Sequence, residues 1–176
     1  MQSKKNYWGY RIDNNARDYF KTELANGRLR QGWGSDVSQD LRNDPSAPDV
    51  RKNLPIYRSV KKGDILLIPR IPEWNSITIA EATEDFDKGY LFQIEDNMGD
   101  YGHIFPARSL MYINRYDEEV SSAILSSFHV RRRFWSVNSC ANDIETILYP
   151  SKSVNLFSYA TKELSTDAFY VGFSAC

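Results

Sequence analysis

The chain has 176 residues and a net charge of −1, with 41% hydrophobic and 26% charged residues, which predicts one globular domain, with or without a small appendage. A near-neutral chain is not a polycation, so a nucleic-acid site would have to be a local basic patch. Two cysteines exclude a disulfide framework and a cysteine metal site. They fit a reducing cytoplasm, and we expect neither a signal peptide nor a membrane span.

The first quarter of the chain predicts alternating strands and helices. These elements are a strand over 6–12, a helix over 13–27, a strand over 28–33 and a helical turn over 35–43. Asp13 or Asn14 can cap the helix, Asn26 and Gly27 end it, and Ser35 can cap the turn. A proline-rich loop follows over 44–55.

The middle of the chain predicts a meander of strands. These are a buried strand over 64–69, a half-buried strand over 75–86, a strand over 89–95 after a turn at 87–89, and one or two short strands over 103–116. Later segments predict helices over 117–128, capped by Asp117, over 142–148 and over 153–164. The apolar end over 168–176 is expected to be either a packed strand or a sign that the chain is part of a longer protein.

This pattern predicts an α+β fold in which a mixed, mostly antiparallel sheet curls into a small β-barrel with flanking helices. We expect the barrel to occupy residues 1–115 and a helical extension, residues 116–176, to pack on it.

Catalytic and metal-binding signatures are absent from the sequence. His103, one of two histidines, is expected to be a surface or edge residue at the start of a strand. The acidic residues of 81–87 are expected to form a solvated hairpin face and not a metal site. We therefore predict no metal and no cofactor, and favour a chain without catalytic activity.

The four tryptophans carry more information. Trp8 is expected in the core, whereas Trp135 follows three arginines and marks either a helix edge or a nucleic-acid contact. Trp33 and Trp74 fall in predicted loops, where each is either a core plug or a flat wall for a flat ligand. The glycines on both sides of Trp33 would allow a sharp turn and close approach of a ligand.

A resemblance to a known family follows from these motifs. Residues 6–115 resemble the PUA-like superfamily, and YTH and EVE domains within it. The resemblance lies in the order of elements: a strand, a capped helix, a strand ending in "QGWGS", a "KKGD" turn, an apolar strand and a strand ending in Ala-Glu. Those domains are barrels that read modified bases. Ile79 replaces the family's glycine before Ala-Glu, and Trp74 precedes the strand that the second cage tryptophan normally follows. The second wall therefore stays open between Trp74, Phe86 and Tyr101.

The resemblance implies a noncatalytic module that holds a modified or flipped base in an aromatic pocket. The candidate base-binding residues are Trp33, Trp74, Asp13, Asn14 and Ser35, and the candidate phosphate-binding residues are Arg11, Arg28, Arg30, Arg131, Arg132 and Arg133. The expected partner is nucleic acid, with DNA favoured over RNA. We expect no binding to a membrane. A larger effector or nuclease of a modification-dependent restriction system would fit, in the cytoplasm.

Two alternatives stay open. One is a small hydrolase related to ASCH domains, which would need Lys61 or Lys62 beside Glu81. The other is a protein-interaction module, suggested by the apolar end of the chain.

Overall fold

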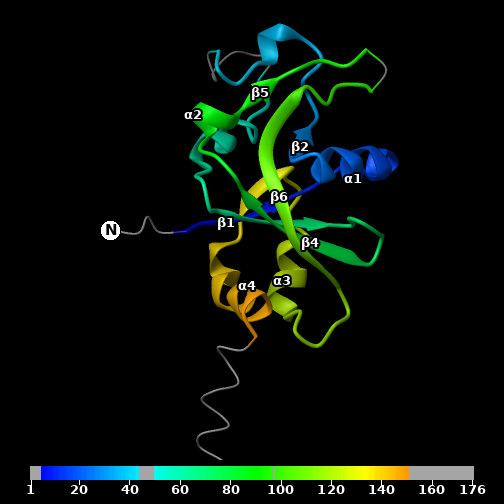
Figure 1. Cartoon of the computed structure of the whole chain (residues 1–176), viewed down its shortest axis with the longest axis vertical. Coiled ribbons are helices and arrows are strands. Elements are labelled where there is room, and N and C mark those ends of the chain that lie inside the picture. Colours follow the sequence, from blue (N-terminus) through cyan, green and yellow to red (C-terminus); the bar gives the residue numbers. More distant parts are fainter. Residues whose placement is uncertain (1–4, 44–49, 97, 151–176) are drawn as a thin grey trace, which may run out of the picture.

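One curled, mixed sheet of seven strands organises the part of the chain that the computed structural model describes, residues 5–43, 50–96 and 98–150 (Figure 1). Its strands are β1 (Tyr7–Tyr10), β2 (Arg28–Gln31), β3 (Ile65–Pro69), β4 (Ser76–Ala82), β5 (Leu91–Phe92), β6 (His103–Asn114) and β7 (Phe134–Ser136). The helices are α1 (Arg17–Ala25), α2 (Phe86–Gly89), α3 (Ser122–Ser127) and α4 (Ala141–Leu148), with 3₁₀ turns η1 (Asn14–Ala16), η2 (Val37–Gln39), η3 (Pro55–Ser59) and η4 (Asn138–Cys140).

The strand order is β2-β6-β4-β3-β1-β7, and β5 pairs with β6. Within the described residues, β1 and β3 pair in parallel and the other neighbours pair antiparallel. With β2 and β7 at its two ends, the curled sheet is a half-barrel. The α+β class and the curled mixed sheet with flanking helices, as predicted, are confirmed.

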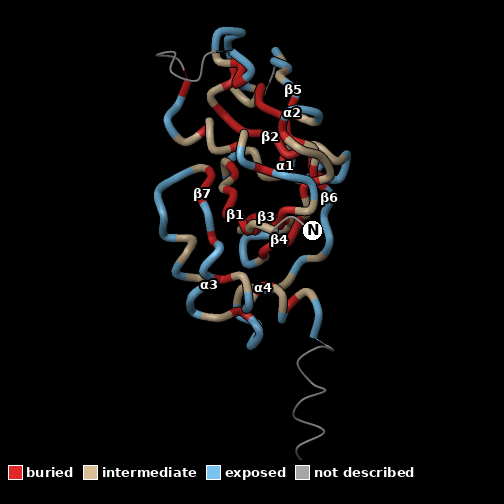
Figure 2. The backbone as a smooth tube through the Cα atoms, turned by 90° about the vertical axis from the view of Figure 1, so that its left-hand side faces the viewer, coloured by how far each residue is buried: buried red, intermediate tan, exposed pale blue. Residues whose placement is uncertain are grey.

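Strands β1, β3 and β4 consist mostly of buried residues (Figure 2), because apolar clusters cover both of their faces. On one face Trp8, Leu66 and Ala80 belong to the larger cluster, to which α1, β2 and β6 also contribute. On the other face Leu67 and Ile79 pack with residues of α3 and α4. The prediction of a half-buried strand over 75–86 is therefore wrong in its burial, since helices cover the second face as well.

The C-terminal segment contributes to the sheet as well as covering it. Strand β7 pairs antiparallel with β1, and Trp135 within it is buried, so Trp135 lies neither on a helix edge nor on an exposed nucleic-acid surface. The extension over 116–176 is thus not purely helical. The helix over 153–164 and the strand over 168–176 lie outside the described residues.

Several local predictions need correction. Asp36, and not Ser35, caps η2, because its carboxylate accepts the N–H of Ser38. Ser121, and not Asp117, caps α3 through its hydroxyl. Residues 103–114 form one long strand where one or two short ones were expected, because pairing with β2, β4 and β5 along its length supports it.

The described helices are all too short or too polar to cross a membrane.

Candidate functional site

A pocket of about 330 Å³ gathers most of the residues predicted to bind a base or phosphate. Its lining consists of Arg11, Ile12, Asp13, Asn14, Trp33, Arg131, Arg132 and Arg133. Strand pairing explains the assembly. Tyr10 pairs with Phe134, so the residues that follow β1 lie beside those that precede β7, and the N–H of Arg11 donates to the carbonyl of Arg133 (2.8 Å).

Trp33 has an unusual backbone conformation for a bulky residue. Its φ is 64°, in the left-handed region that non-glycine residues seldom adopt. Its N–H donates to Oδ2 of Asp100 (2.8 Å), and the next N–H, of Gly34, donates to the carbonyl of Asp100 (2.7 Å). Nε2 of His103 lies 2.9 Å from the carbonyl of Trp33. These three contacts fix the direction in which the indole leaves the chain.

The glycine after Trp33 is required for a different reason from the one expected. The left-handed residue is Trp33 itself, while Gly34 lies against Gly102 so closely that a Cβ on it would come 2.7 Å from the Gly102 nitrogen. A Cβ on Gly102 would come 2.1 Å from the carbonyl oxygen of Gly34. Backbone contact between the two loops, and not approach of a ligand, thus requires Gly34.

Cationic side chains lie over the Trp33 ring. The guanidinium carbon of Arg133 is 5.0 Å from the ring centroid, and that of Arg51, which the sequence did not single out, is 5.4 Å away. These are distances at which a cation is attracted to the negative face of an indole. Trp33 is half-buried against the larger cluster, so it is neither a full core plug nor a free surface residue.

Asp13 and Asn14 lie on the same pocket in different states. The carboxylate of Asp13 accepts the N–H of Asn15 (3.0 Å) and the hydroxyl of Tyr101 (3.1 Å). Asn14 is exposed, and its side-chain amide has no hydrogen bond to another residue in the described part of the chain. Asn14 therefore presents a donor and an acceptor to the pocket, whereas Asp13 mainly orders the loop.

His103 is buried, contrary to the prediction of a surface or edge residue. Its Nδ1 contacts the hydroxyl of Tyr90 (2.7 Å), which accepts the N–H of Leu41 (3.1 Å). Since the carbonyl of Trp33 can only accept, Nε2 of His103 must carry the proton, and Nδ1 then accepts from Tyr90. Burial lowers the pKa of His103 below the usual 6.5, which favours this neutral imidazole with its proton on Nε2.

This pKa shift predicts a loss of stability in mild acid. The unfolded chain binds a proton at His103 more readily than the folded one, so stability is complete above pH 6.5 and falls as the pH decreases toward the lower folded pKa. One titrating group can contribute a slope of at most about 1.4 kcal/mol per pH unit. Urea unfolding at a series of pH values should show it in the wild type and lose that component in His103→Gln. Equal pH dependence in both proteins would contradict a buried neutral imidazole.

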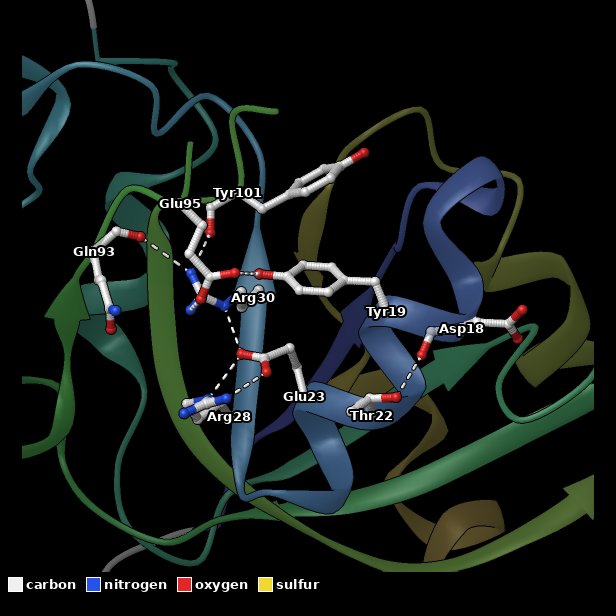
Figure 3. A network of polar contacts seen from close by, with 9 residues as sticks. All are labelled: Asp18, Tyr19, Thr22, Glu23, Arg28, Arg30, Gln93, Glu95 and Tyr101. Carbon is white, nitrogen blue, oxygen red and sulfur yellow. Dashed lines mark hydrogen bonds and ion pairs between the residues drawn. The ribbon is translucent and has the colours of Figure 1, made fainter. Parts of the chain in front are cut away.

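Two of the predicted phosphate-binding arginines do not belong to the pocket (Figure 3). Arg30 is 1% exposed and donates through Nε to Glu23 (2.6 Å), through Nη2 to Glu95, and through Nη1 to the carbonyls of Gln93 and Tyr101 (both 3.1 Å). The expectation that Arg30 contacts phosphate is therefore wrong. Arg28 forms two hydrogen bonds to the carboxylate of Glu23 and is likewise engaged away from the pocket.

Two predicted base-binding residues also lie elsewhere. Ser35 is exposed and contacts Gln39, and Trp74 does not line the Trp33 pocket. Trp74 instead lies at the end of the β3–β4 hairpin, 51% exposed, with the guanidinium of Arg70 over its ring. Of the other candidates for a second wall, Phe86 is buried in the larger cluster and Tyr101 packs against Tyr19 and Phe20.

Two of the residues proposed for a hydrolase are paired with other side chains. Glu81 pairs with Arg108 (2.7 Å), and Lys62 pairs with Glu84 (3.5 Å). Within residues 5–43, 50–96 and 98–150, no three His, Cys, Asp or Glu side chains form a group that could hold a metal ion.

Comparison with known proteins adds little. No family model and no curated protein matches the chain. The solved structures similar to it include the NMR structure of Rpa0253 from Rhodopseudomonas palustris, at 13% identity and a TM-score of 0.42, covering 81% of this chain and 90% of that one. Another is the crystal structure of Atu2648 from Agrobacterium tumefaciens, at 15% identity and a TM-score of 0.35, covering 80% and 92%. Any function has to be argued from the site itself.

Proposed function

We propose that the chain is a noncatalytic module that binds nucleic acid and holds a modified or flipped base beside Trp33. One observation carries the proposal: a single pocket combines an indole, a free amide and four arginines, Arg11 and Arg131–Arg133. Its volume of about 330 Å³ lies in the lower range of small-molecule sites. The resemblance to YTH and EVE domains, with Trp33 as the matching tryptophan, supports the same reading.

The indole supplies the stacking surface. Withdrawing a base from its stack costs a few kcal/mol, and stacking on an aromatic side chain returns about 1–3 kcal/mol. The guanidinium groups of Arg133 and Arg51 are planar and lie over the ring at 5.0 and 5.4 Å. An incoming base would displace one of them from the ring, and the released arginine is then placed beside the phosphates of the same nucleotide.

Selectivity would come from the pocket's polar rim. The free amide of Asn14 has the donor and acceptor that can pair with a base edge. Asp13, held by the Asn15 N–H and the Tyr101 hydroxyl, keeps the loop that carries Asn14 in place. A base that left these groups unpaired would bind less tightly.

We further propose DNA in preference to RNA, a cytoplasmic location, and a larger effector or nuclease as the assembly that this module directs. The arginines that line the pocket supply the local positive charge that a near-neutral chain needs for such a partner. The protein-interaction alternative rests on the apolar end of the chain, which lies outside the described residues.

Calorimetric titration tests this function directly. Matched oligonucleotides, in DNA and RNA forms, would carry one methylated base or none. We expect binding at low ionic strength and at least about tenfold discrimination between modified and unmodified base, the scale that one methyl group provides in a shaped pocket. An absence of binding to every oligonucleotide at low salt would refute the proposal.

A further inference from the structure

A second cavity of about 450 Å³ adjoins the Trp33 pocket. The two share Arg11, Ile12 and Asn14 in their linings. The second cavity adds Arg70, just after β3, and Arg115, just after β6, and residues at the end of α3 also line it. Three arginines line it, and its lining contains no carboxylate.

Arg70 and Arg115 lack the partners that other arginines of this protein have. In the described part of the chain, neither guanidinium has a hydrogen bond or an ion pair to another residue, and the buried Nε of Arg115 has no hydrogen-bond partner. By contrast, Arg28, Arg30 and Arg108 all pair with glutamates. Donors that are collected around a cavity and left unpaired favour an anionic ligand.

The β3–β4 hairpin holds Arg70 in place. Arg70 has a φ of 71°, its N–H donates to the carbonyl of Ser76 (2.7 Å), and its guanidinium carbon lies 4.2 Å from the centroid of Trp74. Attraction to a ring face leaves the N–H groups at the edge of the guanidinium free to donate. Trp74 thus helps to position Arg70, and the guanidinium carbon of Arg17 also lies 5.4 Å from the centroid of its ring.

Arg11 lies among the like charges of Arg70 and Arg133. Its pKa is lowered, first by burial and then by the charges of Arg70 and Arg133. Its Nη2 donates to the carbonyls of Phe128 (2.8 Å) and Val130 (2.6 Å), which keeps it in the shared wall despite this repulsion. A bound anion would relieve the repulsion.

We propose that this cavity binds a phosphate group through Arg70 and Arg115, with Arg11 in its wall. Planar guanidinium groups match the oxygens of phosphate in bidentate geometry. This assignment rests on the proposed function: the phosphate group is that of the phosphodiester next to the base at Trp33, since the two cavities share a wall. A small phosphorylated molecule is the other source, and the experiment separates the two.

The first arm uses inorganic phosphate, which carries no base. Titration followed by NMR of the arginine Nε–Hε groups should move the Arg70 and Arg115 signals saturably and leave that of Arg108 unmoved. We expect Arg70→Gln and Arg115→Gln each to weaken phosphate binding about tenfold, the loss of one charge-assisted hydrogen-bonding group. Arg108→Gln, the same change at an exposed arginine paired with Glu81, should leave it unchanged. Absence of saturation, or equal shifts of the Arg108 signal, would overturn the site.

The second arm measures oligonucleotide affinity over a range of salt concentrations. If the phosphate belongs to the strand, the Arg70→Gln/Arg115→Gln double variant should reduce the slope of log K against log salt by about 0.7 for each phosphate that the protein no longer neutralises. An unchanged slope, with phosphate still bound in the first arm, would assign the site to a small phosphorylated ligand. Phosphate binding without any oligonucleotide binding would keep the site and refute the proposed function.

Discussion

Replacing Arg30 by methionine is expected to lower the free energy of unfolding by about 3–5 kcal/mol, the range for removing one partner from a buried ion pair. Arg30 is 1% exposed, and its guanidinium donates four hydrogen bonds, to two carboxylates and two backbone carbonyls (Figure 3). Methionine fills much of the volume but leaves those acceptors without their donor. Urea unfolding followed by circular dichroism measures the effect.

Arg28 offers a matched control. It pairs with the same carboxylate, that of Glu23, but its side chain is 43% exposed, so water can replace what Arg28→Met removes. We expect a loss of at most about 1 kcal/mol there. Similar losses in the two variants would show that burial does not determine how much the Arg30 network contributes to the free energy of unfolding.

Replacing Trp33 by alanine is expected to weaken oligonucleotide binding by about 1–3 kcal/mol, the contribution of stacking one base on one aromatic ring. The backbone at this position is held by Asp100 and His103, so removal of the indole should leave the loop in place. Trp33→Phe keeps a smaller aromatic face and should retain part of the affinity. Fluorescence anisotropy with a labelled single strand measures all three proteins.

Tyr112→Ala is the control for this comparison. Tyr112 is an aromatic residue of β6, 67% exposed, that lines neither of the two cavities. Its replacement should leave affinity unchanged, and the thermal unfolding of each variant shows that it is folded. A folded Trp33→Ala protein with wild-type affinity would remove Trp33 from the binding site and end the base-pocket proposal.

Local chemistry made the elements around the site predictable. Asp13 caps the turn η1 that leads into α1, and Gly27 follows α1 with a φ of 77°. Both signals act between residues a few positions apart, so they can be read from the chain alone. Placement of Trp33 beside Asp13, Asn14 and Arg131–Arg133 was also predicted as one site, and the pocket brings these residues together.

Arg28 and Arg30 show what could not be predicted from the local sequence. Both were predicted to bind phosphate, and they alternate with Leu29 along β2. In the structure, Glu23 and the segment that contains Gln93, Glu95 and Tyr101 cover their face of the strand. The covering residues lie up to 71 positions away along the chain, so no local pattern announces them.

Residue period and capping signals were enough to predict the class of fold and the capped helix α1, and the resemblance to YTH and EVE domains grouped a tryptophan with arginines. Which arginines remain unpaired depends on contacts between segments far apart in the chain. Pairing of β1 with β7 brings Arg11 beside Arg133, the β3–β4 hairpin presents Arg70, and packing around Glu23 buries Arg30. A guanidinium has the same chemistry in all these places, and its neighbours across the fold decide whether it stabilises the protein or is free to bind a ligand.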